Sequence, residues 1–280
     1  MKTFRKIWLG FVVLMLLLFV GYRIFELIKT DSSGPVISGG EEAITISISD
    51  GEDVLLAGLR AYDQKDGDVT DSLIVEKLSN FYSDGTRIVT YAAFDSDNHI
   101  SKMERKISYS DYESPKLELT GSLRFRAGET PNIDKIVKAY DSLDGDLSNK
   151  VKIHMDTTLN TRITGFYNVI YEVSNSAGDT VKLPIEVEIY EPYNYEVELN
   201  LDRYLVYYEG TALKYRDYIK SVHRGNMDYD YSEIADQCSV TVDSQVDTGV
   251  PGVYPVYYYF TQVIGNTTYE AKEILYVVVE

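Results

Sequence analysis

The chain has 280 residues, with 44 acidic against 27 basic side chains and a net charge of -17 at neutral pH. Its 44% hydrophobic and 12% aromatic content is enough for real cores, which argues against wholesale disorder. The acidic balance argues against nucleic acid as a partner. A single cysteine excludes an internal disulfide and a multi-cysteine zinc site.

The first 30 residues differ from the rest in charge and in hydropathy. The 16 residues from Ile7 to Tyr22 carry no charge, and as a helix they span about 24 Å. Snorkelling by Lys6 and Arg23, with apolar residues continuing to Ile28, extends this segment toward the thickness of a bilayer. We therefore predict that residues 1–30 are a cytoplasmic tip and a transmembrane signal anchor, in contact with the membrane through residues 7–28.

The competing interpretation of this segment is a cleaved signal peptide. No A-x-A-like site follows the apolar core, where the chain reads VGYR from Val20 to Arg23, so the uncleaved anchor is favoured. Basic residues at Lys2, Arg5 and Lys6 place the N-terminus inside. The prediction is a single-pass protein of the cell membrane, with residues 31–280 extracytoplasmic.

The remainder of the chain repeats itself. Residues 61–69 (AYDQKDGDV) and 139–147 (AYDSLDGDL) share six of nine positions, and Gly-x-x-x-Val-x-Tyr recurs at Gly85, Gly165 and Gly252. Copies of about 80 residues exceed the length of a solenoid unit. They predict three domains, at residues 31–110, 111–190 and 191–280, of which the third is divergent and rich in tyrosine.

Hydrophobic residues alternate with polar ones inside each copy, which is typical of half-buried strands. The segments concerned are 45–49, 167–173, 183–189, 238–242, 254–260 and 274–279. Residues 133–139 and 215–222 each have the character of a short helical turn. The predicted fold class is all-β, with tandem immunoglobulin-like β-sandwiches following an N-terminal transmembrane helix.

Three motifs in sequence carry a family resemblance. The run A-x-D-x-x-D-G-D-[VL], then G-x-Y-x-V-x-Y, then an Asn/Asp-Ser-x-Gly/Asn turn resembles the bacterial immunoglobulin-like repeats described from pesticidal crystal proteins and many surface proteins. Residues 34–190 carry most of it. Arg87 replaces the first tyrosine in copy one, and copy three lacks the acidic turn. The resemblance implies display on an envelope, and it implies that Tyr167 and Tyr254 form tyrosine corners.

The acidic turns are the candidate metal sites. Carboxylate oxygens are the ligands that Ca²⁺ prefers, and the candidates are Asp63, Asp66, Asp68, Asp141, Asp144 and Asp146, with Asp71 close by. Their spacing lacks the order of an EF-hand. The alternative is an Asx-type turn in which Gly67 or Gly145 takes a positive φ. We predict no cofactor unless the acidic turns hold calcium.

Chemistry-bearing residues give no support for an enzyme. His99, His154 and His223 are scattered along the chain, which disfavours a transition-metal site. Cys238 shares an alternating face with Val240 and Val242, which predicts a buried small residue instead of a nucleophile. The sequence holds no nucleophile elbow, P-loop or H-E-x-x-H motif. We therefore predict a protein without catalytic residues.

Tyrosine is concentrated at the C-terminal end, with 15 of the 25 in the last 90 residues. Neighbouring rings in a strand point to opposite faces, so alternation cannot bury all of them. Candidate partner-binding residues are Tyr257 and Tyr259, together with Tyr229 and Tyr231 in a predicted loop. The alternative is that tyrosine is simply a good strand former.

Two functions from different classes follow from these features. The first is surface recognition or adhesion through the distal third domain, with an envelope glycan, a wall polymer or a protein as partner. The second is a structural spacer or an assembly component of an envelope complex.

Overall fold

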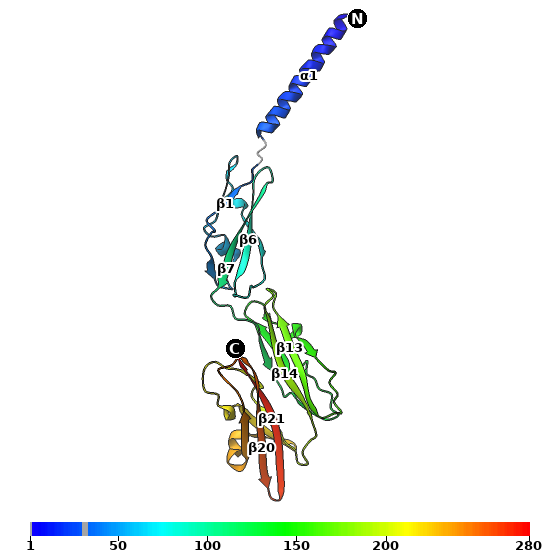
Figure 1. Ribbon diagram of the computed structural model, residues 1–280, viewed down its shortest axis with the longest axis vertical. Coiled ribbons are helices and arrows are strands. Elements are labelled where there is room, and N and C mark those ends of the chain that lie inside the picture. Colours follow the sequence, from blue (N-terminus) through cyan, green and yellow to red (C-terminus); the bar gives the residue numbers. More distant parts are fainter. Residues whose placement is uncertain (1, 30–32) are drawn as a thin grey trace. The chain divides into compact units, whose positions relative to one another are not determined.

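An apolar helix precedes a series of β-sandwiches in the computed structural model, which describes residues 2–29 and 33–280 (Figure 1). Helix α1 spans Lys2–Lys29. Its segment Phe4–Phe25 has a mean hydropathy of 2.3 and no buried side chain, so it is long and apolar enough to cross a membrane. A signal sequence has the same properties. Residue 1 of the predicted tip and residues 30–32 lie outside the described residues.

Residues 33–280 form six sheets, which fall into three equivalent pairs. In the first pair, a three-stranded sheet has the order β1-β3-β4 and a four-stranded sheet has the order β2-β7-β6-β5. The strands are β1 (Val36–Ser38), β2 (Ile44–Ile46), β3 (Arg60–Asp63), β4 (Gly67–Asp68), β5 (Ile74–Leu78), β6 (Arg87–Phe94) and β7 (Ile100–Tyr109). Short helices α2 (Glu52–Leu56) and η1 (Thr70–Ser72) connect them.

The second and third pairs repeat this topology strand for strand, as β8-β10-β11 with β9-β14-β13-β12 and as β15-β17-β18 with β16-β21-β20-β19. The second pair contains β8 (Lys116–Leu119), β9 (Arg124–Arg126), β10 (Val137–Asp141), β11 (Gly145–Asp146), η2 (Ser148–Lys150), β12 (Lys152–Met155), β13 (Gly165–Ser174) and β14 (Thr180–Tyr190). The third contains β15 (Glu198–Leu201), β16 (Leu205–Tyr207), η3 (Tyr215–Tyr218), β17 (Ile219–Arg224), β18 (Met227–Asp230), α3 (Tyr231–Ile234), η4 (Ala235–Gln237), β19 (Ser239–Ser244), β20 (Gly252–Ile264) and β21 (Thr267–Val279).

The two sheets of each sandwich are linked in the same way in all three copies. A short early strand crosses to the second sheet and runs parallel to the last strand, in the pairs β2–β7, β9–β14 and β16–β21. The first segment of each copy therefore contributes a strand to both sheets, which holds the two layers together. This arrangement confirms the predicted fold class of tandem β-sandwiches after an N-terminal apolar helix.

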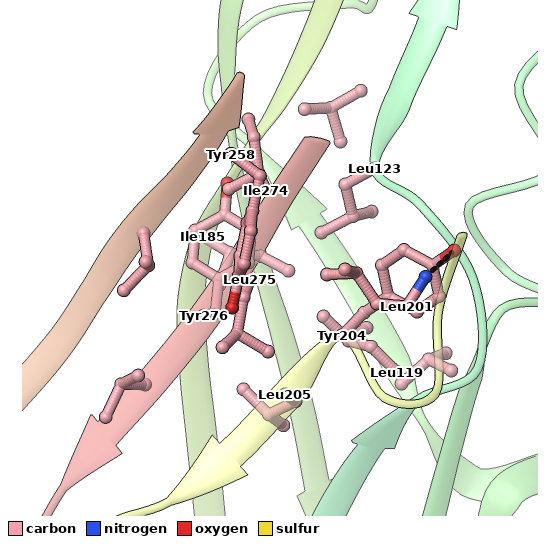
Figure 2. Close-up of a cluster of buried hydrophobic side chains, with 14 of the residues drawn as sticks. Leu119, Leu123, Ile185, Leu201, Tyr204, Leu205, Tyr258, Ile274, Leu275 and Tyr276 are labelled. Atoms are coloured by element: carbon pink, nitrogen blue, oxygen red, sulfur yellow. Dashed lines mark hydrogen bonds between the residues drawn. The ribbon is translucent and has the colours of Figure 1, made fainter. Parts of the chain in front are cut away.

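The chain divides into two compact units, Met1–Tyr112 and Glu113–Glu280. The first has its own core, which includes Val89, Tyr91 and Ile107. The second contains two sandwiches, whose buried residues form one continuous hydrophobic cluster. Figure 2 shows side chains of both sandwiches in that cluster, such as Leu119 and Ile185 together with Leu275. The division into three domains stays a prediction.

The last tyrosine of the repeated glycine–valine–tyrosine motif has one function in all three copies. Tyr91, Tyr171 and Tyr258 are fully buried. Their hydroxyls donate to the carbonyls of Leu55 (2.9 Å), Ile133 (2.7 Å) and Tyr215 (2.9 Å). Each bond ties the crossover segment between the two sheets to the central strand, and it pairs a hydroxyl that would otherwise be buried without a partner.

The tyrosine corners implied by the family resemblance are present. The Tyr167 hydroxyl donates to the carbonyls of Ile163 (2.9 Å) and Asn160 (3.0 Å), and the Tyr254 hydroxyl donates to the carbonyl of Val250 (2.9 Å). In copy one, Arg87 Nε donates to the carbonyl of Ser79 (2.7 Å). The arginine thus makes the same kind of bond back to the preceding loop as the tyrosine that it replaces.

Most predicted strands are confirmed, but some local predictions are wrong. Residues 215–222 are helical only as far as Tyr218, because β17 begins at Ile219. Residues 133–139 are a turn that leads into β10. The predicted loop at Tyr229–Tyr231 is instead the end of β18 and the start of α3, whose first turn is capped by Asp230 accepting the Ser232 N–H.

Candidate functional site

The aspartates predicted as calcium ligands lie in two matching turns that follow β3 and β10. Asp63 Oδ1 accepts the backbone N–H groups of Lys65 and Asp66, at 2.8 and 2.9 Å. Asp141 Oδ1 accepts those of Leu143 and Asp144, at 2.9 and 2.8 Å. The glycines that close the turns, Gly67 and Gly145, have φ values of 78° and 74°. This geometry is that of the Asx-type turn predicted as the alternative.

The other four aspartates of these turns also accept hydrogen bonds. Asp66 and Asp144 each accept both the N–H and the hydroxyl of a serine on the facing loop, Ser96 and Ser176 respectively. Asp68 and Asp146 accept bonds from Thr70 and Ser148 at the start of the following 3₁₀ turn. These hydroxyl bonds lower the pKa of Asp68, Asp144 and Asp146.

Among the side chains that the structure describes, no group of three or more His, Cys, Asp or Glu residues is arranged to hold a metal ion. Calcium binding by the acidic turns therefore stays a prediction.

The two acidic turns differ at one buried contact. In the second sandwich, Asn175 Nδ2 donates to Asp141 Oδ2 at 3.1 Å. Asp95 occupies the matching position in the first sandwich. Asp95 Oδ1 and Asn175 Oδ1 each accept the backbone N–H groups of the residues two and four positions later in the chain. An ionised carboxylate has no hydrogen to donate, so Asp95 cannot replace the hydrogen bond that the Asn175 amide donates. Asp63 Oδ2 is consequently a buried atom without a hydrogen-bond partner.

Replacing Asn175 by aspartate is expected to destabilise the second sandwich, because Asp141 Oδ2 loses its donor. An unsatisfied buried polar group costs about 1–3 kcal/mol. The reciprocal change, Asp95→Asn, should stabilise the first sandwich by less, because the new amide supplies the missing donor to Asp63 but replaces the oxygen that pairs with His99 Nδ1 at 2.6 Å. Hydrogen-exchange protection of β6 and β13 at pH 8 measures both effects in the full chain in detergent. A loss of protection in both variants would contradict the comparison of the two turns.

The four candidate tyrosines lie in two places. Tyr257 and Tyr259 alternate with buried Tyr258 and so share the outer face of β20; Tyr259 is 40% exposed, and Tyr257 is half-buried. Tyr229 is half-buried on β18, with the Arg224 guanidinium 4.5 Å from its ring centroid. Tyr231 is half-buried at the start of α3, where burial raises its pKa.

Most tyrosines of the third sandwich are internal. Between residues 191 and 280, all of which the structure describes, only Tyr193, Tyr195 and Tyr259 are exposed. Several of the others join the third sandwich to the second. The Tyr276 hydroxyl donates to the Glu186 carbonyl (2.6 Å), and the Tyr207 hydroxyl accepts the Leu117 N–H (3.0 Å). Packing thus accounts for much of the tyrosine content.

An aromatic face remains exposed beside this contact. We give this name to Phe166, Tyr193, Tyr257 and Tyr259. Lys272 Nζ lies 5.3 Å from the centroid of Phe166 and 4.8 Å from that of Tyr257, which brings residues of the second and third sandwiches around one ammonium group. Burial raises the pKa of Tyr193, while the nearby Arg124 acts to lower it and Tyr259 acts to raise it. Phe166 is 49% exposed.

A buried ionic cluster lies beneath the aromatic face. Glu188 on β14 accepts hydrogen bonds from Arg124 Nε on β9 (2.8 Å) and from Lys272 Nζ on β21 (3.0 Å). Arg124 also donates to the Lys272 carbonyl, and its guanidinium lies 4.0 Å from the Tyr190 ring centroid. One carboxylate from the second sandwich therefore pairs with a cation from each sandwich, within low-dielectric surroundings.

A second carboxylate is buried close to this cluster. Glu273 on β21 accepts the Ser122 hydroxyl of the second sandwich and the N–H of Ile274, both at 2.8 Å. Its side chain has almost no access to water. Burial raises the pKa of Glu273 to about 7, although both hydrogen bonds and Arg124 oppose the change.

A polar groove follows the contact between the two sandwiches. It consists of a cleft of about 370 Å³, which Arg124, Arg126, Glu196 and Glu273 help to line, and an adjoining cleft of about 560 Å³. Thr120, Asn200 and Tyr204 line both clefts. We call the two together the seam groove. The repeat pattern of the sequence does not reveal it, because each of its walls comes from a different repeat.

The chain matches no protein-family model. It is similar to the pesticidal crystal protein Cry22Aa of Bacillus thuringiensis, with 28% identity over 151 residues. The match covers 51% of the chain and 20% of the length of that protein. This similarity agrees with the resemblance to pesticidal crystal proteins indicated by the motifs.

Solved structures of low similarity were also found. One contains the M60 catalytic domain with two CBM51 domains of Clostridium perfringens ZmpB, at 11% identity, 88% coverage of this chain, 43% coverage of that chain and a TM-score of 0.28. Another is human CDH23 EC21-23, at 11% identity, 88% and 100% coverage and a TM-score of 0.22. At these scores the similarities carry no argument about fold or function.

Proposed function

We propose that the chain is a non-enzymatic surface recognition or adhesion protein, built from bacterial immunoglobulin-like repeats and anchored in the cell membrane by residues 7–28. The length and hydropathy of Phe4–Phe25 support the anchor, and the basic residues before it support an extracytoplasmic position for residues 31–280. The similarity to a pesticidal crystal protein supports the repeat family.

The observation that carries the proposal is the aromatic face. Exposed aromatic rings provide rigid, amphipathic contact area at low entropic cost. Most tyrosines of the third sandwich are engaged in packing, whereas Tyr259 and Phe166 remain about half exposed. Partners of this face are an envelope glycan, a wall polymer or a protein.

The environment of the single cysteine supports a non-enzymatic role. Burial raises the pKa of the Cys238 thiol, although Arg216 nearby opposes the change, whereas a nucleophilic cysteine needs a lowered pKa. Cys238 is half-buried instead of fully buried as predicted. His99 and His223 each bond to a carboxylate in the adjoining turn, at Asp95 (2.6 Å) and Asp228 (2.9 Å).

The test is retention of the detergent-solubilised full chain on isolated envelope fractions, meaning wall material and solubilised membrane proteins. Replacing both Tyr257 and Tyr259 by alanine is expected to weaken retention by about tenfold or more, since aromatic anchors dominate contact energies. The matched control replaces Tyr62 on β3 and Tyr140 on β10. Both are more exposed than Tyr257 and Tyr259, but they belong to three-stranded sheets, whereas β20 belongs to a four-stranded sheet. Undiminished retention of the Tyr257 and Tyr259 variant would rule the face out.

The second candidate function is a spacer or assembly component of an envelope complex. The ionic cluster around Glu188 favours it, because buried charges from both sandwiches are paired with one another across the contact. Absence of retention for wild type and for both variants would support the spacer.

A further inference from the structure

We infer that the seam groove binds a neutral saccharide chain. This inference rests on the proposed recognition function and gives it a second site and a ligand class. The groove lies wholly within Glu113–Glu280 and contains none of the four residues of the aromatic face, although Lys272, which lies against Phe166 and Tyr257, lines one of its clefts.

Several groups that form the groove are charged, buried and held in place. The side chains of Arg124 and Glu196 are 5% and 7% exposed, and Glu273 is 6% exposed. Arg126 Nε donates to Glu196 at 2.9 Å, and a cation–π contact holds Arg124 over Tyr190. Polar groups fixed in this way bind a ligand without a large cost of ordering.

The mixture of donors and acceptors matches sugar hydroxyls. Each hydroxyl of a saccharide both donates and accepts, so a complementary site needs donors beside acceptors. The groove offers a guanidinium from Arg126, carboxylates from Glu129 and Glu198, an amide from Asn200 and a hydroxyl from Thr120. Few apolar side chains contribute, so a hydrophobic ligand would leave these polar groups unpaired.

The charge of the lining selects against anions. Six acidic residues line the two clefts, namely Glu129, Glu196, Glu198, Glu273, Asp228 and Asp230, against the four basic residues Arg124, Arg126, Lys220 and Lys272. Both arginines and Lys272 already pair with carboxylates. A phosphate or uronate would meet a net negative groove, whereas a neutral sugar needs no counter-charge.

The size of the groove suits a chain of sugar rings. Clefts that bind small molecules measure about 300–1,000 Å³, and each of the two lies in this range. Because Thr120, Asn200 and Tyr204 belong to both, the clefts adjoin, and one ligand occupies them in series.

The test is calorimetric titration of the full chain in detergent with maltotetraose, xylotetraose and chitotetraose, and with a hyaluronan tetrasaccharide as the anionic control. We expect saturable binding of at least one neutral probe and none of the anionic one. Thr120→Trp, at an exposed position shared by the two clefts, should weaken neutral binding by about tenfold or more by occupying the groove. If that variant does not fold, Asn200→Ala is the replacement.

The Tyr257 and Tyr259 double variant distinguishes this inference from the proposed function. Saccharide affinity that persists in that variant and falls in Thr120→Trp supports the seam groove. Absence of binding by all three neutral probes, equal binding of the anionic probe, or unchanged affinity in both groove variants overturns it. Retention on envelope fractions that depends on the aromatic face would then still support the proposed function.

Discussion

Glu188→Ala is expected to lower the free energy of unfolding of the Glu113–Glu280 unit by about 3–5 kcal/mol, the usual cost of removing one partner from a buried ionic group. The Arg124 side chain is 5% exposed and that of Lys272 is 13% exposed. Without Glu188, two cations remain close together in a poorly solvated contact. The effect should be concentrated where the second and third sandwiches meet.

The matched control is Lys182→Ala on β14, the strand that also carries Glu188, and it removes an exposed partner of Glu172 on β13. Exposed ion pairs contribute little, because water and salt screen them, so this variant should unfold almost as wild type does. Urea unfolding, read by hydrogen exchange of β14 and β21, compares the two. Similar behaviour of the two variants would show that the cluster is solvated and does not couple the sandwiches.

The strands and the repeat were predictable because their signals are local. Alternation from Tyr167 to Val173 and from Leu183 to Ile189 defines two strands that are paired over ten residues. The glycine–valine–tyrosine motif recurs because each sandwich needs the same buried hydroxyl bond at Tyr91, Tyr171 and Tyr258. These requirements act within about 80 residues, so each copy displays them in full.

The contact between sandwiches was not predictable, because alternation does not distinguish a face turned to water from a face turned to another sandwich. Glu186, Glu188 and Tyr190 occupy the outer positions of β14, where polar residues are expected in either case. The structure shows Glu188 buried by Lys272, which lies 84 residues further along the chain. Glu188 and Lys272 come together only when the second and third sandwiches pack against each other.

The tyrosine candidates illustrate the same limit. The sequence places Tyr257 and Tyr259 on one face of a strand, and the structure confirms that placement. The sequence gives no sign that Phe166 of the preceding repeat lies close to the Lys272 ammonium that also contacts Tyr257. Helix α3 was missed for a different reason, since four residues are too few to show a helical period.

Glu273→Gln is expected to make the stability of the Glu113–Glu280 unit less dependent on pH. Burial raises the pKa of Glu273 from 4.5 to about 7. The folded unit therefore binds more protons than the unfolded chain between these two values. The associated stability is fully present below pH 4.5 and is lost as the pH rises through 7, by about 3 kcal/mol in total.

Glutamine has the shape of protonated glutamate, and its Oε1 can accept the same bonds from Ser122 and the Ile274 N–H. The variant should thus match wild type near pH 4.5 and exceed its stability at pH 8 by about 3 kcal/mol. Carboxylates with a lowered pKa, such as Asp144 and Asp146, lose their contribution to the stability only below pH 3.8, which is outside the range compared here. The histidines are common to both proteins and cancel in the difference.

Urea unfolding of the full chain in detergent between pH 4.5 and 8, read by hydrogen exchange of β20 and β21, gives this difference directly. The matched control is Glu113→Gln, since the Lys116 bond lowers the pKa of Glu113 instead and its own difference should not grow between pH 5 and 8. A constant difference between Glu273→Gln and wild type would mean that water reaches Glu273. In that case the contact between the sandwiches is open, and the seam groove extends deeper than its lining residues indicate.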